Sequence, residues 1–377
     1  MNPAAIEVGH FPGNGPSART MRKRSWIGPA RRRTTTIFMN PKHVLAVLTM
    51  SSVIARSAGV AGVAGVAGVE TLVEAPGPIG ALKGSMLAPP VSHGPVVLII
   101  PGSGAIDRDG NSPAGVLAAP YRLLAEGLVA RNVTTVRIDK RGFAGSAGAT
   151  PDGNAVTIPD YVADVNAWIT VLQQRTRASC VWLLGHSEGG LVALAAARNS
   201  HVCGLILVSA AGRPMGELVR EQLKANPANA PLLDEALPAI DALEAGKKVD
   251  TATMHAPLLR LFDPRVQGFL ISVFSYDPAQ LLSDYKKPVL IVQGLRDIQV
   301  SEADAQLLKK ADPAATLVLL PDVNHVLKLV SSDDLRANFA TYGNSSLPLA
   351  PGVIDAIYAF LTANSKTEAT SSGRAKH

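Results

Sequence analysis

Short apolar runs alternate with stretches of helical spacing along most of the chain. Strand-like segments, most of them apolar, lie at 96–100, 134–138, 180–184, 203–209, 289–292 and 316–320. Helical spacing lies at 121–131, 161–175, 191–198, 303–310 and 352–362. Ahead of all these, 70–73 and 79–87 flank Pro76-Gly77-Pro78 and predict an antiparallel hairpin. The alternation predicts an α/β fold on a mostly parallel, doubly wound sheet, and the run at 96–100 is typical of a strand buried on both faces.

One long segment interrupts this alternation. Residues 212–287 show helical spacing with no strand pattern, so we expect a helical insertion between two parts of one core, 69–211 and 288–364. Three phenylalanines gather in the second half of the insertion: Phe262, Phe269 and Phe274. Either they form a small core of the insertion itself, or they line a pocket beneath it as part of a lid.

The start of the chain has the pattern of a processed segment. Residues 1–38 lack hydrophobic periodicity and are rich in Arg, Pro, Gly and Thr, so we expect a disordered basic extension. From Met39, a short basic stretch precedes an apolar run at 44–55 that is too short to span a bilayer. This resembles a secretory signal with Met39 as the initiator, and the Gly-Val-Ala repeats that complete 39–68 predict a low-complexity linker.

Other interpretations of the chain ends stay open. Arg31-Arg32-Arg33 is compatible with a twin-arginine export route, and the apolar run could instead dock on the domain as an N-terminal helix. We expect export to the periplasm or the medium, with a cytoplasmic location as the alternative. Residues 365–377 are polar and predict a disordered tail.

The positive charge of the chain is concentrated at its start. The net charge is +6, and residues 1–43 hold eight basic residues against Glu7 alone, which leaves the remainder close to neutral. We therefore expect no basic groove and no nucleic-acid partner. The two cysteines, Cys180 and Cys203, each begin an apolar run. We expect buried free thiols, with one disulfide as the alternative if the protein is exported and the two strands are neighbours.

Gly185-His186-Ser187-Glu188-Gly189 lies between an apolar run and an alanine-rich helical run. That context fits the G-x-S-x-G pattern, in which a sharp strand-to-helix turn exposes the serine. The two outer glycines let neighbouring backbone pass close by. We therefore predict Ser187 as a nucleophile. His186 and Glu188 point apart on such a turn, so we expect no metal site and no cofactor.

A serine hydroxyl needs a base that takes its proton and an acid that orients the base. On an elbow of this kind the order along the chain is Ser, acid, His. Asp297 follows the run at 289–292, and His325 follows the last run, so both loops open at the carboxyl edge of the sheet. We predict these two residues rather than Asp322, which is too close to His325 in sequence to approach the imidazole easily.

The tetrahedral intermediate of such a reaction needs two N–H donors. One donor should be the backbone N–H of Glu188. The other should come from Gly102-Ser103-Gly104, after the run at 96–100, and we predict Ser103. This loop lacks the lysine of a P-loop and the G-x-G-x-x-G spacing, which disfavours a nucleotide site. We expect the substrate pocket to be lined by residues of this loop and of the insertion: Gly102, Gly104, Phe262, Phe269 and Phe274.

In this order the motifs resemble those of the α/β-hydrolase superfamily, in its bacterial serine-esterase and serine-aminopeptidase-like group. The matching segments are 101–104, 107–110, 139–142, 185–190, 294–297 and 324–325. The resemblance covers roughly 69–364 and implies an α/β-hydrolase fold with an inserted lid and a Ser-Asp-His triad. The chain departs from the esterase pattern at Pro101, where those enzymes often carry a histidine.

The resulting prediction is a carboxylesterase-type serine hydrolase that acts on a small-molecule acyl ester through an acyl-enzyme, with no stable membrane anchor. Because the same triad serves all acyl transfers, an aminopeptidase-like or acyl-thioesterase activity is the alternative. An aminopeptidase also needs acids that hold the substrate ammonium, for which Glu188, Asp107, Asp234 and Glu235 are unconvincing. An exported, non-catalytic ligand-binding protein of this fold is a further alternative, which the intact serine, aspartate and histidine set disfavours.

Overall fold

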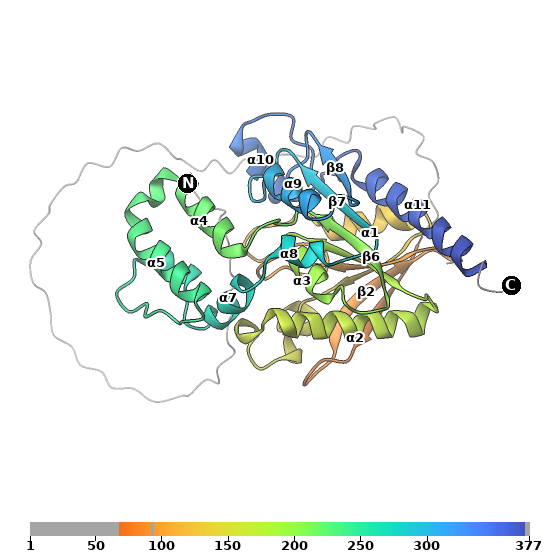
Figure 1. Ribbon diagram of the computed structural model, residues 1–377, viewed down its shortest axis with the longest axis horizontal. Helices are drawn as coiled ribbons and strands as arrows, with labels where there is room; N and C mark the ends of the chain where they lie inside the picture. Colours follow the sequence, from red (N-terminus) through yellow and green to blue (C-terminus); the bar gives the residue numbers. More distant parts are fainter. Residues whose placement is uncertain (1–67, 92–93, 374–377) are drawn as a thin grey trace, which may run out of the picture. The chain divides into compact units, whose positions relative to one another are not determined.

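The computed structural model describes residues 68–91 and 94–373. The predicted basic extension, and the predicted signal and linker segment up to residue 67, lie outside these residues. Within them, eight strands form one sheet in the order β1-β2-β4-β3-β5-β6-β7-β8 (Figure 1). The strands are β1 (Val69–Ala75), β2 (Leu82–Ala88), β3 (Val96–Ile100), β4 (Thr134–Ile138), β5 (Val181–His186), β6 (Val202–Val208), β7 (Val289–Gly294) and β8 (Thr316–Leu320).

The pairing of the strands confirms the predicted α/β-hydrolase fold. β1 and β2 form the expected antiparallel hairpin, with Val69 opposite Ala88, and β2 is antiparallel to β4. All neighbours from β4 to β8 are parallel. β4 and β5 flank β3 on opposite sides, so the winding direction changes there, and a crevice opens at the carboxyl ends of the strands at such a switch point. The loops that follow β3 and β5 carry Ser103 and Ser187.

Helices cover both faces of the sheet (Figure 1). α1 and α11 pack with Val97 and Ile99 of β3, and α2 and α3 pack with Leu98 and Ile100 of the same strand. Alternate residues of β3 therefore enter two separate cores, as expected of a strand buried on both faces. The helices of this core are α1 (Pro120–Val129), α2 (Ile158–Thr176), α3 (Glu188–Ala196), α9 (Glu302–Ala311), α10 (Leu335–Tyr342) and α11 (Val353–Gly373), with short 3₁₀ turns η1 (Ala144–Ala149) and η2 (Gly153–Ala155).

Between β6 and β7 the chain is helical, without a strand. It forms α4 (Met215–Ala225), η3 (Pro227–Leu232), α5 (Leu233–Glu244), α6 (Ala256–Leu261), α7 (Gln267–Phe274) and α8 (Pro278–Ser283). The helical spacing at 258–276 is divided between α6 and α7 rather than forming one helix. Asp263-Pro264 lies at the break, where the proline ring disfavours helical backbone at the residue before it.

Two elements differ from the sequence-based expectation at the C-terminal end. α11 continues past Thr362 to Gly373, into the segment expected to be a disordered tail. Residues 363–372 contain neither proline nor glycine, so nothing in the local sequence ends the helix before Gly373. α10 was not expected, because its sequence lacks a clear apolar stripe and buries only Asn338 and Thr341.

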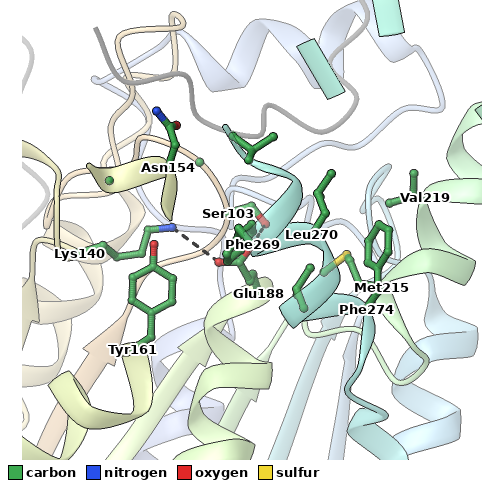
Figure 2. Close-up of a pocket in the computed structure, with 14 residues that line it drawn as sticks. Ser103, Lys140, Asn154, Tyr161, Glu188, Met215, Val219, Phe269, Leu270 and Phe274 are labelled. Carbon is green, nitrogen blue, oxygen red and sulfur yellow. Dashed lines mark hydrogen bonds and ion pairs between the residues drawn. The ribbon is translucent and has the colours of Figure 1, made fainter. Parts of the chain in front are cut away.

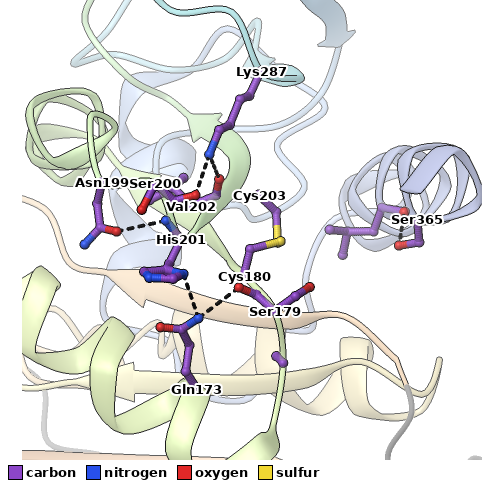
Figure 3. The surroundings of a disulfide bond; sticks show 12 residues. Gln173, Ser179, Cys180, Asn199, Ser200, His201, Val202, Cys203, Lys287 and Ser365 are labelled. Atoms are coloured by element: carbon purple, nitrogen blue, oxygen red, sulfur yellow. Dashed lines mark hydrogen bonds between the residues drawn. A yellow bond between two sulfur atoms is a disulfide. The ribbon is translucent and has the colours of Figure 1, made fainter. Parts of the chain in front are cut away.

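Cys180 and Cys203 are joined in a disulfide rather than free, which corrects the expectation of two thiols (Figure 3). They lie where β5 and β6 begin, and these two strands are parallel neighbours, with Cα atoms of the cysteines 5.1 Å apart. The bridge therefore lies at the amino-terminal edge of the parallel strands. Ser187 follows the end of β5, at the opposite edge. No helix within the described part of the chain combines the length and apolar character needed to cross a membrane.

Candidate active site

Ser187 occupies the turn between β5 and α3 with φ 55° and ψ −124°. A positive φ is strained for a residue with a side chain and persists only where the surroundings hold it. Here the Ser187 N–H donates to the Val208 carbonyl at 3.0 Å, and the Ser187 carbonyl accepts from the Gly190 N–H at 2.9 Å. The turn is thus fixed to the neighbouring strand and to its own helix, and the Ser187 side chain is left partly exposed.

The glycines on either side of Ser187 are required by close backbone contacts. A Cβ on Gly185 would lie 2.2 Å from the Gly189 carbonyl oxygen, and one on Gly189 would lie 2.3 Å from the Ile100 carbonyl oxygen. Real Cβ atoms do not approach oxygen so closely, and the atoms they would meet are backbone. The steric role predicted for these glycines therefore holds in the structure.

Asp297 and His325 form a buried pair at the same edge of the sheet. His325 Nδ1 lies 2.8 Å from Asp297 Oδ2, with both side chains almost fully buried. Asp297 Oδ1 accepts the N–H groups of Gln299 and Val300 at 2.8 and 3.0 Å. Burial alone would raise the pKa of Asp297, but His325 and these N–H groups hold it below its ordinary value. Asp297 is therefore a carboxylate that keeps a proton on Nδ1 of His325 and leaves Nε2 as the nitrogen that can exchange a proton with Ser187.

Neither Asp322, the alternative acid, nor Ser187 is hydrogen-bonded to the His325 imidazole. Asp322 is half exposed and lies 3.8 Å from Arg296, away from the imidazole. No hydrogen bond joins Ser187 Oγ to His325 among the described residues. Hydrogen bonds of this kind are often long without substrate and shorten in the reacting complex. The structure thus pairs Asp297 with His325, and it connects Ser187 to them through the preceding residue, His186.

A chain of hydrogen bonds runs from the loop after β3 to the backbone of His325. The Gly102 N–H donates to the Tyr121 hydroxyl at 3.0 Å, that hydroxyl lies 2.9 Å from His186 Nδ1, and His186 Nε2 lies 2.8 Å from the His325 carbonyl. A carbonyl can only accept, so Nε2 carries the proton and Nδ1 accepts from Tyr121. Burial, then the charge of His325, lower the pKa of His186 to about 3, so its ring is neutral.

The two predicted oxyanion donors, the N–H groups of Ser103 and Glu188, are free to donate in the described part of the chain. Among the described residues, neither the Ser103 N–H nor the Glu188 N–H donates to a backbone or side-chain acceptor. Gly102 is held on both sides, because its N–H donates to Tyr121 and its carbonyl accepts from Lys140 Nζ at 2.6 Å. The loop is therefore fixed with its next N–H unused, which suits a preorganised donor.

Side chains of the same loop and helix form a buried charged cluster. Ser103 Oγ donates to Glu188 Oε2 at 2.8 Å, and Lys140 Nζ lies 3.7 Å from Glu188 Oε1. Burial lowers the pKa of Lys140, and Glu188 opposes that shift. Glu188 Oε1 has no hydrogen-bond partner in the described part of the chain. The pair is neutral as a whole whether or not the proton moves from one side chain to the other.

A pocket open to solvent lies above this cluster (Figure 2). Gly104, Phe269 and Phe274 line it, together with Ser103 and Glu188. Gly102 and Phe262 do not: the Gly102 peptide is engaged by Tyr121 and Lys140, and Phe262 is fully buried in the core of the insertion. Both interpretations of the insertion's phenylalanines hold in part, since Phe262 fills its core and the other two line the pocket.

Several residues around the site were missed by the sequence analysis. The sequence analysis predicted a role for the Glu188 backbone but none for the side chains of His186 and Glu188, because a pattern match alone does not say what the variable positions contact. Tyr121 gave no signal, since an aromatic residue at the start of an amphipathic helix is usually a core residue. The remaining pocket residues come from distant elements: Lys140, Gly153, Asn154, Tyr161, Met215, Val219, Val266, Leu270 and Val273.

The family model for serine aminopeptidases, S33, matches residues 117–328, which is more than half of the chain. The chain belongs to this family of the α/β-hydrolase superfamily. The matched part of this S33 family member begins just before α1 and ends three residues after His325, so it includes Ser187 and Asp297. The loop that carries Ser103 lies before it.

Two relatives of this family member are described as an esterase and a lipase. Esterase EstD of Thermotoga maritima is 26% identical over 241 residues, which are 62% of this chain and 54% of the relative. Lipase 1 of Psychrobacter immobilis is 24% identical over 192 residues, which are 46% of this chain and 58% of the relative. The chain thus spans little more than half the length of either relative. Both support the classification as a hydrolase.

Two solved structures of low sequence identity match parts of this chain. Est1E from Butyrivibrio proteoclasticus is 17% identical, with a TM-score of 0.48 over 78% of this chain and 98% of its own. The Pyrococcus furiosus esterase Pf2001 is 16% identical, with a TM-score of 0.48 over 69% of this chain and 84% of its own.

Proposed function

We propose that this hydrolase cleaves carboxylic esters through an acyl-enzyme. Ser187 attacks the ester carbonyl, His325 Nε2 takes the hydroxyl proton and gives it to the leaving alcohol, and Asp297 holds His325 in the required tautomer. The N–H groups of Ser103 and Glu188 donate to the oxyanion. Water then attacks the acyl-enzyme: His325 Nε2 takes a proton from the water and returns it to Ser187 as the carboxylic acid leaves. The observation that carries the proposal is the buried Asp297–His325 hydrogen bond at the sheet edge to which the strained Ser187 turn also opens.

The state of the acids near the pocket favours an ester over an aminopeptidase substrate. An aminopeptidase must hold a substrate ammonium with a carboxylate that is otherwise free. Glu188 is already engaged by Ser103 and Lys140, and Lys140 would repel a second cation. Glu235 is paired with His255, and Asp107 accepts N–H groups of its own loop. Most of the pocket wall is apolar, as suits an acyl or alkyl group.

A labelling and substrate experiment tests this function. A fluorophosphonate probe should modify wild-type protein on Ser187 and leave Ser187→Ala unmodified. Wild type should cleave p-nitrophenyl butanoate faster than the matching acyl-thioester and aminoacyl p-nitroanilide, and Ser187→Ala should lose the activity. Faster cleavage of the anilide would favour the peptidase alternative. A wild-type protein that the probe does not label would favour the non-catalytic ligand-binding alternative.

We also propose that the protein is exported. Disulfides form and persist in oxidising compartments and are rare in the reducing cytosol, and Cys180–Cys203 is such a bond. N-terminal sequencing of protein recovered from the periplasm or the medium tests this proposal. Recovery only from the cytosolic fraction, with both thiols reactive toward maleimide, would contradict it.

A further inference from the structure

The pocket is divided into two chemically different arms. Figure 2 shows Lys140, Asn154 and Tyr161 on one side of Ser103 and Glu188, and lid residues including Val219 and Phe274 on the other. We call the first group, together with Glu188 Oε1, the polar arm. A pocket meant for a plain alkyl ester would gain nothing from a polar arm, because buried polar groups are costly unless they are paired.

The groups of the polar arm have unused hydrogen-bonding capacity. Within the described part of the chain, the Asn154 side chain and the Tyr161 hydroxyl make no hydrogen bond, and Glu188 Oε1 and Asn154 Oδ1 are buried without a partner. Lys140 has three donors, of which one is held by the Gly102 carbonyl at 2.6 Å. Its ammonium also faces Glu188 Oε1 at 3.7 Å, too long for a hydrogen bond, and lies 5.4 Å from the centre of the Tyr161 ring. These side chains are between 3% and 8% exposed. They come from four separate elements, so their meeting in one corner is a feature of the tertiary fold.

The charges of the arm restrict what it can bind. Lys140 and Glu188 sum to no net charge, and each lies where it would repel a ligand group of its own sign. An ammonium would approach Lys140, and a carboxylate would approach Glu188 Oε1. A neutral hydroxyl fits both, since its oxygen accepts from the lysine and its hydrogen donates to the carboxylate or to the Asn154 amide. The Tyr161 hydroxyl can join the same network either as a donor or as an acceptor.

From this arrangement we infer that the enzyme selects esters that carry a neutral hydroxyl near the scissile bond, and that Lys140, Asn154, Tyr161 and Glu188 bind that hydroxyl. This inference rests on the proposed ester hydrolysis and specifies its substrate class. The arm adjoins Ser103 and Glu188, whose N–H groups are the proposed oxyanion donors, so the hydroxyl lies within a few bonds of the reacting carbonyl. The apolar arm takes the other part of the substrate.

Two isosteric substrate pairs test the inference. On the acyl side, p-nitrophenyl 3-hydroxybutanoate is compared with p-nitrophenyl 3-methylbutanoate. On the alcohol side, 2-hydroxyethyl butanoate is compared with propyl butanoate. Wild type should prefer the hydroxylated member of one pair by about 10-fold or more in kcat/KM, because a buried site left unpaired rejects the methyl analogue. Each ratio is normalised to the ratio for hydroxide-catalysed hydrolysis.

The variants Asn154→Leu and Tyr161→Phe should each reduce that normalised ratio toward one. Tyr358→Phe is the matched control, because it removes the same hydroxyl from α11, outside the pocket, and it should keep the wild-type ratio. Fluorophosphonate labelling of each variant confirms that it is folded. Equal turnover within both pairs by wild type overturns the inference that the polar arm binds a substrate hydroxyl. An unchanged preference for the hydroxylated ester in both labelled variants overturns it as well. Failure of wild type to cleave any of the four esters overturns the proposed function instead.

Discussion

His186 Nε2 donates a hydrogen bond to the backbone carbonyl of His325 at 2.8 Å. The residue before the proposed nucleophile thereby holds the loop of the proposed base. Through Tyr121, the same imidazole also holds Gly102, next to the proposed oxyanion donor Ser103. One neutral ring therefore connects three loops that must keep fixed distances during the reaction.

Replacing His186 should impair catalysis more than substrate binding. His186→Leu leaves the Tyr121 hydroxyl and the His325 carbonyl without their partner, so both loops can shift. Displacements of about 1 Å at an active site cost roughly 100-fold in rate, and we expect kcat to fall by that order while KM changes little. Steady-state kinetics on p-nitrophenyl butanoate measures both constants. Tyr121→Phe removes the hydrogen bonds at only one end of this network and should reduce kcat less. A His186→Leu enzyme with wild-type kcat would rule out this positioning role.

His186 should also make stability depend on pH in a defined window. Its pKa is about 3 in the folded protein, against 6.5 ordinarily. Below pH 6.5 the unfolded chain binds a proton that the folded chain does not, so the free energy of unfolding should decrease as pH falls from 6.5 toward 3. The full shift corresponds to roughly 5 kcal/mol. Urea denaturation of wild type and His186→Gln across this range measures the effect, since the variant lacks the imidazole, and parallel pH curves would contradict it.

Lys140 and Glu188 should be energetically coupled. Lys140→Met leaves the Glu188 carboxylate buried without its cation, and breaking a buried pair in this way costs about 3–5 kcal/mol. Adding Glu188→Gln removes the uncompensated charge and should restore part of that loss. The free energies of unfolding of wild type, both single variants and the double variant form a cycle that measures the coupling. Strict additivity would mean that the two side chains act independently.

The sequence was sufficient for the sheet and for the proposed triad because their signals are local. Short runs rich in apolar and β-branched residues predicted the strands from β3 to β8, and Ser187, Asp297 and His325 each follow a strand that ends at the same edge. Other features depend on contacts between distant segments. Neither the Tyr121–His186 hydrogen bond nor the corner shared by Lys140, Asn154 and Tyr161 leaves a periodic trace. The disulfide also required knowledge that β5 and β6 are neighbours, which is tertiary information.

The phenylalanines of the insertion should separate into two classes. Phe262 is fully buried outside the pocket, so Phe262→Ala should destabilise the protein by about 3–5 kcal/mol. Phe269 is partly exposed, lines the pocket and packs edge-on against Tyr161 at 6.3 Å between ring centres. Phe269→Ala should cost less stability and should raise KM for acyl esters. Urea denaturation and steady-state kinetics of both variants check this, and equal effects on both properties would show that the two residues share one role.

The Cys180–Cys203 disulfide should stabilise the fold without taking part in catalysis. The bridge closes a loop across 23 residues, for which the chain-entropy model gives a stabilisation of about 3 kcal/mol. Dithiothreitol should therefore lower the Tm of wild type. It should not change the Tm of the Cys180→Ala/Cys203→Ala variant, which has no bond to reduce. Because the bridge lies where β5 begins and Ser187 follows the end of that strand, kcat of the double variant should stay close to wild type well below its Tm. A large loss of kcat at that temperature, with the protein still folded by circular dichroism, would mean that strain or motion at the bridge reaches the Ser187 turn through β5.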